Sequence, residues 1–233
     1  MIVYILGEAH SGKGEAARHL VAEHGFTEIC FADPMKRVLV DWYGFTEDQL
    51  WGESGLRNVP DSRFPRTRKR MVDRFRSDEQ ETYIDCLTPR EALQTLGEAM
   101  RGCFEQTWNN QLFRDIQKMS VPAYANTCIY PGYVRTIGVA GLISCKGVRK
   151  FLVSDVRHRS EHDELRAAGA VGLRIVSPTQ GKGLTGKLAE HRSETEQREI
   201  PDSELREVVH NDGTIAELHA CLDAFMEKHT TGP

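Results

Sequence analysis

Short apolar runs and amphipathic stretches follow one another along most of the chain. The apolar runs cover residues 2–6, 28–31, 151–154, 171–176 and 207–210. Each is bounded by polar or glycine residues and followed by helix-like sequence, as with Ala17, Leu20 and Val21 after the first run. The alternation predicts an α/β fold, with a mainly parallel five-stranded sheet flanked by helices.

Two helix starts are marked by their polar residues. Thr88-Pro89-Arg90-Glu91 and Thr214-Ile215-Ala216-Glu217 both have the capping-box pattern, with proline at the first helical position of the former. Two regions break the alternation. Residues 121–147 resemble a hairpin insertion in composition, and residues 57–80 hold a dense cationic run: Arg63, Arg66, Arg68, Lys69, Arg70, Arg74 and Arg76.

Composition narrows the class of protein. The 233 residues suit one domain with insertions. The 30 Lys and Arg against 34 Asp and Glu give a net charge of −4, which does not indicate nucleic-acid binding. No apolar run approaches the roughly 18 residues of a membrane span, and the N-terminus lacks a basic leader. The six cysteines form no CxxC pair, so we expect reduced thiols and a cytoplasmic protein.

The strongest chemical motif lies between the first strand and the first helix. Residues 7–14 read Gly-Glu-Ala-His-Ser-Gly-Lys-Gly and match GxxxxGK at a strand-to-helix junction. Gly7 and Gly12 let the loop turn its N–H groups, including that of Ser11, toward an anion, and Lys13 reaches the β- and γ-phosphates of a nucleotide. The alternative is a glycine-rich turn without a ligand, which would require neither the lysine nor this context.

The residue after the lysine departs from the usual motif. Gly14 stands where a Ser or Thr hydroxyl normally binds Mg²⁺, and Glu15 follows it in the nucleotide-binding segment. We therefore expect Mg²⁺ to be held mainly by phosphates and water. Asp155, at the end of the strand from Phe151, is the expected carboxylate beside the loop, although it could also be a helix cap.

Three further segments carry candidate binding groups. Arg157 could bind a phosphate at the sheet edge or pair with Glu161. Residues 178–198 predict a long polar loop or lid whose Lys182, Lys187 and Arg192 could neutralise transferring phosphates. His158 and His162 have the i, i+4 spacing of zinc ligands but lack an evident third ligand, so we interpret them as surface histidines.

The helix from Pro89 predicts two stripes. At 100° per residue, the donors and the aromatic ring fall on one side, and Leu93, Leu96, Met100 and Cys103 on the other. Such a donor stripe could bind a phosphate and stack on a base, or it could be a solvated face with a core tryptophan. Its members are Arg90, Gln94, Gly97, Arg101 and Trp108.

Taken together, these motifs resemble the phage-type deoxynucleoside monophosphate kinases, of the P-loop nucleoside monophosphate kinase group. The resemblance rests on SGKG, FADPMKR, TPREALQTLGEAMR with Trp108, SDVRHRSEHDELRAAGA, HRSE and NDGTIAELHACL, in that order. It does not cover the insertion or the cationic run. It implies one P-loop domain with a core of 1–32, 148–177 and 205–233, an acceptor-binding region of 33–120 and a lid of 178–200.

The resemblance also implies roles for individual residues. The loop from Gly7 to Gly14 would hold the phosphates of ATP, with Mg²⁺ as the metal. Asn211 and Gly213 would lie by the adenine, and Arg192 would act from the lid. The acceptor monophosphate and base would be bound by Asp33, Lys36, Arg90, Gln94, Arg101 and Arg157.

The expected activity is transfer of the γ-phosphate of ATP to a deoxynucleoside monophosphate such as dGMP, dTMP or a modified dNMP. One alternative is a P-loop kinase with another acceptor, either a small phosphorylated metabolite or a hydroxymethylated base in DNA, which the cationic run favours. Another is a nucleotide-binding regulator without catalysis. The sequence leaves base preference and oligomeric state open, with a homodimer as one option, and it predicts no membrane partner.

Overall fold

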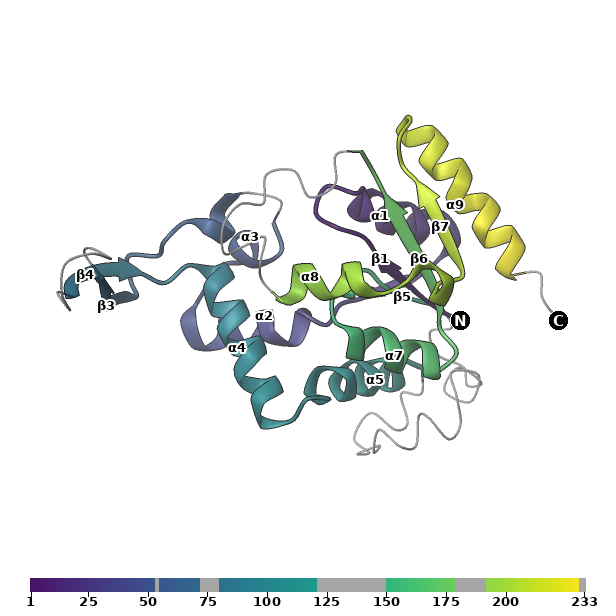
Figure 1. Cartoon of the computed structure of the whole chain (residues 1–233). Coiled ribbons are helices and arrows are strands. Elements are labelled where there is room, and N and C mark those ends of the chain that lie inside the picture. Colours follow the sequence, from purple (N-terminus) through teal and green to yellow (C-terminus); the bar gives the residue numbers. More distant parts are fainter. Residues whose placement is uncertain (53–54, 72–79, 121–149, 179–191, 231–233) are drawn as a thin grey trace. The chain divides into compact units, whose positions relative to one another are not determined.

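The computed structural model describes residues 1–52, 55–71, 80–120, 150–178 and 192–230, without the side chains of residues 70, 71, 80, 192–194 and 230. The chain forms two compact units, Met1–Phe31 with Gln106–Pro233 and, between them in sequence, Ala32–Glu105. Figure 1 labels the elements along the chain. Among the helices that the structure describes, none combines the length and apolarity that a membrane crossing requires.

The first unit is built on a parallel sheet of five strands in the order β2-β5-β1-β6-β7. The strands are β1 (Ile2–Leu6), β2 (Thr27–Ile29), β5 (Phe151–Val153), β6 (Val171–Val176) and β7 (Glu207–His210). The predicted parallel sheet is thus confirmed. All residues of β1 are buried, because the central strand is covered on both faces, which explains its unbroken apolar run.

The second strand differs from its predicted range of 28–31. It ends at Ile29, and the N–H of Phe31 donates to Asp155 Oδ1 at 2.9 Å instead of to a neighbouring strand. The Asp155 carboxylate therefore takes the place of a hydrogen-bond partner on a neighbouring strand. Periodicity could not reveal this, since Phe31 is as apolar as the residues of the strand.

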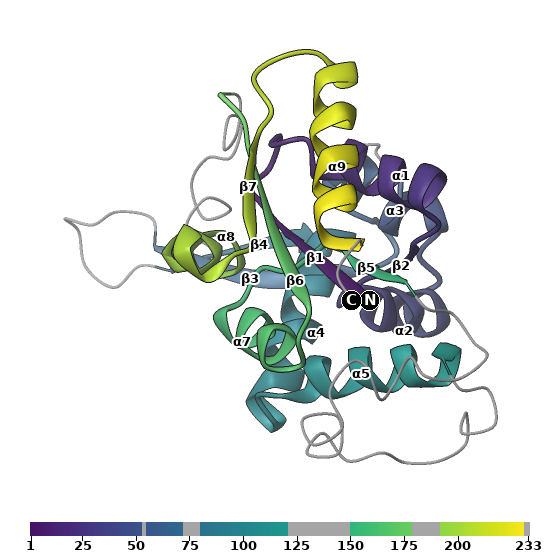
Figure 2. The ribbon, with the colours of Figure 1, turned by 90° about the vertical axis from the view of Figure 1, so that its right-hand side faces the viewer.

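Helices cover both faces of the sheet. α1 (Lys13–His24) and α9 (Ile215–Thr230) lie side by side (Figure 2). Together with Val3 and Ile5 they form a buried core to which α1 contributes Ala16, Ala17 and Leu20, and α9 contributes Leu218, Leu222, Phe225 and Met226. On the opposite face, Tyr4 contacts α7 (Arg159–Ala167), and α5 (Thr107–Ser120) lies beside α7. Tyr4 has room because its register partner is Gly172, where a Cβ would lie 2.5 Å from the tyrosine ring.

The two predicted capping boxes differ. At α9, Thr214 and Glu217 exchange hydrogen bonds in both directions, as predicted. At α4 (Pro89–Cys103), the Thr88 hydroxyl accepts the Glu91 N–H, and proline takes the first helical position. The Glu91 carboxylate binds two arginines. Both helix starts are confirmed, but the second uses its glutamate for a tertiary contact.

The second unit holds the remaining described elements before α5. They are α2 (Asp33–Tyr43), α3 (Glu47–Leu50), η1 (Gly55–Asn58), β3 (Pro65–Met71), β4 (Gln80–Cys86) and α4. Leu39, Phe45, Leu50 and Ala92 form its small core, with Leu93 and Leu96 packed against it. The predicted apolar stripe of α4 is confirmed at those two leucines, whereas Met100 and Cys103 are exposed.

The cationic run of residues 57–80 overlaps the strand β3, which the hydrophobic pattern did not predict. β3 and β4 pair as an antiparallel ribbon in which Arg66 lies opposite Asp85. The side chains of Arg70, Arg74 and Arg76 and the insertion at 121–147 lie outside the described residues. Among the described residues, Cys30, Cys86, Cys103 and Cys221 form no disulfide bond.

Candidate active site

The glycine-rich loop joins the central strand to α1. β1 ends at Leu6 and α1 begins at Lys13. Gly12 has φ 100°, a left-handed conformation, and a Cβ there would overlap the side-chain amide of Asn211. A Cβ on Gly7 would lie 2.6 Å from the carbonyl oxygen of Ile175. Both glycines are therefore required by close approach of neighbouring strands and loops, and Gly12 also by its backbone conformation.

Two side chains of this loop have the chemistry of an anion site. The Lys13 ammonium donates to the carbonyl of Gly7 and, at 2.7 Å, to that of Glu8. Ser11 is 1% exposed, and its Oγ has no hydrogen-bond partner among the described residues. A buried hydroxyl without a partner costs about 1–3 kcal/mol. A phosphate oxygen bound in the loop would remove that cost and would draw the flexible lysine away from the carbonyls.

Asn211 is a predicted nucleotide-site residue that is distant from the loop in sequence but contacts it in the structure. It follows β7, and its Nδ2 donates to the Ser11 carbonyl at 3.0 Å. Its own N–H donates to Val176 at the end of β6. Asn211 thus holds the loop against the sheet edge. A position of Asn211 and Gly213 beside an adenine stays a prediction.

Asp155 and Arg157 follow β5, the neighbour of β1 in the sheet. Tyr4 pairs with Val153 in a parallel register, so Asp155 and the loop leave the same carboxyl edge. Asp155 Oδ1 accepts the Phe31 N–H, while Glu161 accepts the backbone N–H groups of Arg157 and His158. Glu161 is therefore used in capping α7. The phosphate-binding role of Arg157 stays a prediction.

The residues around the loop fit a metal held through water better than a direct ligand set. Gly14 offers no hydroxyl, and a Cβ there would meet nothing within 4 Å. The Glu15 carboxylate contacts Arg18 and His219, each at 2.8 Å. Asp155, at the carboxyl edge of the sheet, accepts the Phe31 N–H through Oδ1. Binding of Mg²⁺ mainly through phosphates and water stays a prediction.

The predicted loop at 178–198 is partly helical. Residues 179–191, with Lys182 and Lys187, lie outside the described residues, but α8 (Arg192–Glu199) is a helix that begins at Arg192, whose side chain is not described. Sequence analysis missed Arg198 on this helix, which donates to Glu8 Oε2 of the loop at 2.9 Å. The i, i+4 spacing of Glu194 and Arg198 and the lack of Gly or Pro from 188 to 199 were the available signals.

The interpretation of His158 and His162 as surface residues is wrong. His158 is 6% exposed and its Nδ1 lies 3.0 Å from Glu196, while His162 is fully buried between Tyr4 and Glu204. Burial lowers the pKa of His162 and raises the pKa of Tyr4 to about 12. His162 lies on the side of α7 that faces Tyr4 of the sheet, whereas His158 precedes α7 and contacts α8.

In the second unit, two predicted acceptor-site residues share a cluster with a residue that sequence analysis missed. Asp33 and Lys36 lie in the first turn of α2 with their charged atoms 3.5 Å apart. The Trp51 indole donates to Asp33 Oδ1 at 2.9 Å, and the Lys36 ammonium lies 5.0 Å from its ring centre. Trp51 is 40% exposed. It is a flat aromatic surface held by polar groups.

The prediction that one helix carries Trp108 in line with Arg90 is wrong. α4 ends at Cys103, Phe104 is extended, and Trp108 lies in α5 of the first unit, 7% exposed. Gly97 is buried, and a Cβ there would lie 3.2 Å from Met35, so its small size serves helix packing. Arg90 Nε donates to Asn58 at 2.5 Å. Ligand binding by Arg90, Gln94 and Arg101 stays a prediction.

Three arginines in or just before the β3–β4 ribbon are paired with acids. Arg66 contacts Asp85 and Glu91, Arg68 contacts the same two carboxylates, and Arg63 contacts Asp61 at 2.7 Å. The hydrogen bond from Arg66 lowers the pKa of Glu91, and those from Arg63 lower the pKa of Asp61. Three of the seven basic residues of the cationic run are thus paired with acids within their own unit.

The sheet order, the strand-loop-helix junction and the lysine together define a P-loop α/β fold, as the sequence predicts. No protein-family model matches the chain. A viral protein from Acanthamoeba polyphaga mimivirus, described as "Putative deoxynucleotide monophosphate kinase", is 25% identical over 228 residues, 96% of each chain. The resemblance stated from the motifs is confirmed by this match.

Among solved structures, a dephospho-CoA kinase from Campylobacter jejuni is also similar. It is 13% identical and has a TM-score of 0.43, with 97% of this chain and 96% of that chain covered.

Proposed function

We propose that this chain is an ATP-dependent deoxynucleoside monophosphate kinase. The observation that carries the proposal is the loop between β1 and α1, where a buried hydroxyl without a described partner and a lysine ammonium point to an anion. A kinase-like relative aligned along 96% of both chains supports the nucleotide as that anion. The acceptor class comes from the motif resemblance and the description of that relative.

The donor triphosphate would bind at the carboxyl edge of the sheet. Backbone N–H groups of residues 7–14 and the N-terminus of α1 would hold its phosphates, with Lys13 at the β- and γ-phosphates. When bound, Mg²⁺ supplies charge neutralisation across these phosphates, and Asp155 is the residue that would hold it through water. Asn211 would keep the loop in place beneath the nucleotide.

The reaction needs positioning and charge neutralisation more than proton transfer. An oxygen of the acceptor monophosphate attacks the γ-phosphorus of ATP, and the bond from that phosphorus to the bridging oxygen breaks, leaving its electron pair on ADP. The attacking oxygen is already anionic, so the protein supplies no strong base. Lys13, Arg157 and Arg192 are the cations that we assign to the charge on the transferring group.

Acceptor binding would use the polar groups that the chain presents before residue 110. We assign the monophosphate or base to Asp33, Lys36, Arg90, Gln94 and Arg101 of the second unit. To these we add Trp51, because a half-exposed indole held by Asp33 offers a base a stacking surface. This assignment predicts that changes in the second unit act mainly on the KM for the acceptor.

The proposed lid would contribute cations from residues 179–191, which lie outside the described residues, and from α8. Lys182 and Lys187 keep their predicted role there, with Arg192 at the start of α8. Arg198 is a further candidate, because it already contacts Glu8 of the loop and an incoming triphosphate would compete for its guanidinium. The ion pair would then be exchanged for a phosphate contact.

The alternative of a base within DNA as acceptor loses part of its support. Its motivation was the cationic run, but Arg63, Arg66 and Arg68 are paired with acids. Phosphate contacts with DNA would have to compete with those carboxylates.

The test of the proposed function is an ADP-release assay with ATP against a panel of deoxynucleoside and ribonucleoside monophosphates. We expect turnover with at least one dNMP well above the rate with ATP alone. ATP binding without transfer to any member of the panel would instead favour the regulatory alternative. A salt-dependent shift of DNA in a gel would favour the polynucleotide acceptor.

A further inference from the structure

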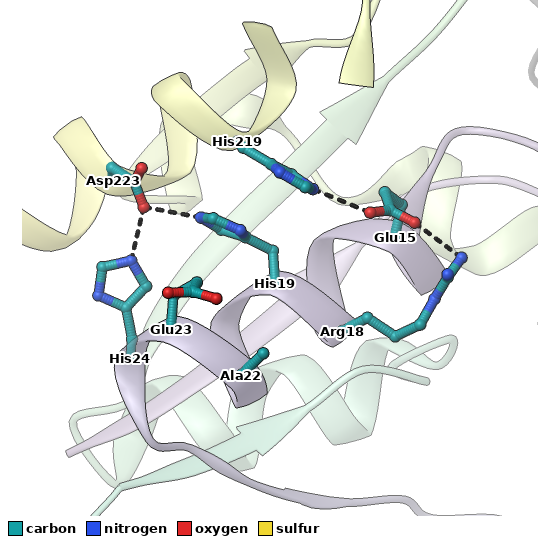
Figure 3. Close-up of a pocket in the computed structure, with 8 residues that line it drawn as sticks. All are labelled: Glu15, Arg18, His19, Ala22, Glu23, His24, His219 and Asp223. Atoms are coloured by element: carbon teal, nitrogen blue, oxygen red, sulfur yellow. Dashed lines mark hydrogen bonds and ion pairs between the residues drawn. The ribbon is translucent and has the colours of Figure 1, made fainter. Parts of the chain in front are cut away.

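A polar pocket lies between α1 and α9, and the proposed phosphoryl transfer makes no use of its histidines. Its volume is about 600 Å³, and His19, His24, His219 and Asp223 contribute to its lining. Figure 3 shows two imidazoles of α1 and one of α9 gathered around Asp223 and Glu15. All these residues belong to the first unit, so their arrangement is defined within one body.

The centre of the cluster is one carboxylate oxygen. Asp223 Oδ1 lies 2.7 Å from Nε2 of His19 and 2.7 Å from Nε2 of His24 (Figure 3). The three potential ligand atoms all lie within 4.8 Å of one another. Two nitrogen atoms and one oxygen atom therefore converge from two helices, with an open pocket beside them.

His219 positions this group from outside it. Its ring stacks on that of His19, with 4.0 Å between centres and 16° between planes, and its Nε2 lies 2.8 Å from Glu15. The stack restricts rotation of the His19 ring, which is 9% exposed. His219 is thus a positioning residue whose own nitrogen faces Glu15.

We propose that His19, His24 and Asp223 form a binding site for a divalent transition-metal ion of the zinc class. Two imidazoles and a carboxylate are a donor set that Zn²⁺, Co²⁺ and Ni²⁺ accept, whereas Mg²⁺ and Ca²⁺ prefer oxygen alone. A fourth, open position would hold water from the pocket. This site is separate from the Mg²⁺ that accompanies ATP.

The distances fit such an ion after a small adjustment. Ligand atoms about 2.1 Å from a tetrahedral ion lie roughly 3.4 Å from each other, so each nitrogen-oxygen distance would open by about 0.7 Å. His24 ends α1, and its side chain is 21% exposed, against 49% for Asp223, so both have room to move. Each imidazole would present the lone pair of Nε2 to the ion and carry its proton on Nδ1.

The carboxylate in the cluster favours a bound cation over a bound anion. One Asp223 carboxylate oxygen faces both His19 and His24, each at 2.7 Å. The other group of this kind, around His162, contrasts with it: its Glu204 is already bound by Arg159 and Arg166. A cation there would have to displace two guanidinium groups.

The expected consequence is a link between the helix after the nucleotide loop and the C-terminal helix. An ion that binds only the folded protein raises its stability in proportion to RT ln(1 + [L]/Kd). Saturating Zn²⁺ should therefore raise the unfolding temperature. This readout needs no nucleotide and no turnover, so its outcome is separate from that of the proposed function.

The experiment is calorimetric titration of the chelator-treated full chain with Zn²⁺, followed by thermal unfolding with and without the ion. We expect one equivalent to bind, with affinity at least tenfold weaker in H24Q and in D223N. The matched control is H210Q, which removes an exposed histidine outside the pocket and should bind within threefold of wild type. D223N keeps the shape of an exposed side chain, so a folded variant is available if H24Q is unstable.

Titration with Co²⁺ separates this site from the cysteines. A set of nitrogen and oxygen ligands gives visible bands without thiolate charge-transfer absorption, and D223N should lose them. Absence of binding, thiolate absorption, or equal affinity in wild type, H24Q and D223N would each overturn the proposal.

Discussion

The loop of residues 7–14 and the β3–β4 ribbon both concentrate cationic groups or hydrogen-bond donors. The partners of these groups differ between the two regions. In the ribbon, Arg66 and Arg68 already hold carboxylates. In the loop, the Lys13 ammonium donates to the carbonyl oxygens of Gly7 and Glu8, and the buried Ser11 hydroxyl has no partner among the described residues. A cation paired with an acid stabilises the fold, whereas a cation on neutral oxygens can be drawn away by a phosphate. Density of basic residues alone does not distinguish the two.

Replacement of Lys13 should give the largest effect on activity. In K13A we expect kcat/KM to fall at least about a hundredfold, or roughly 2.7 kcal/mol of barrier, with the unfolding temperature unchanged. The ADP-release assay measures it, and K118A, an exposed lysine on α5, is the matched control. Activity within tenfold of wild type would contradict the role of Lys13.

Substitutions of Gly12 and Gly14 test the role of the loop in ATP binding. G12A should lose most ATP binding, because its Cβ would overlap Asn211 in a left-handed conformation. G14A has open space on the first turn of α1 and should keep binding while gaining up to about 1 kcal/mol of stability. Titration with a fluorescent ATP analogue compares them; equal losses in both variants would refute the spatial argument.

Arg198 tests whether α8 belongs to the site. R198A should lower kcat about tenfold with a smaller change in the KM for the acceptor, since the residue contacts the loop. R206A removes another exposed arginine and should leave both parameters unchanged. A change confined to the KM for the acceptor would move Arg198 to the substrate side.

The ribbon should respond in stability instead. E91Q leaves two arginines without their shared carboxylate, and we expect a loss of about 1 kcal/mol at pH 7, kept modest because the side chain is a third exposed. The folded pKa of Glu91 is lowered, so its stabilisation is full above the ordinary value of 4.5 and lost as pH falls through the lowered value.

Urea unfolding of wild type and E91Q at pH 7 and at pH 3 measures this. The difference between them should shrink at the lower pH, while D41N, an exposed acid of α2, should match wild type at both. A large loss of kcat in E91Q would contradict a structural role for the ribbon.

Trp51 should give the smallest effect. W51F keeps an aromatic ring and removes the hydrogen bond to Asp33, so we expect the KM for the acceptor to rise about three- to tenfold, as one hydrogen bond of 0.5–1.5 kcal/mol allows. W42F changes a tryptophan that is 75% exposed and should leave the KM unaltered. An equal response of both variants would remove Trp51 from the acceptor site.

The central fold was predictable because it depends on local patterns. Buried parallel strands are apolar throughout, and the loop needs glycine where Asn211 and Ile175 approach, so strand range and motif are visible in the sequence. The helix end at Cys103 was not visible. Phe104-Glu105-Gln106 contains neither proline nor glycine, and continued periodicity placed Trp108 on the wrong helix.

The polar contacts were less predictable than the strands. Pairings such as Arg198 with Glu8, or Asp223 with His19, join residues about 200 positions apart, and no local spacing encodes them. Burial of His162 also depends on which side of α7 faces the sheet. Local residue type indicated the chemistry, and only the topology showed which groups meet.

The most direct measurement of the proposed function follows the label from γ-³²P-ATP into the acceptor, with wild type and K13A in parallel. We predict a labelled deoxynucleoside diphosphate with wild type and one or more dNMPs, and a yield lower by at least about a hundredfold with K13A. Label released only as inorganic phosphate, or equal labelling by both proteins, would contradict phosphoryl transfer from this loop.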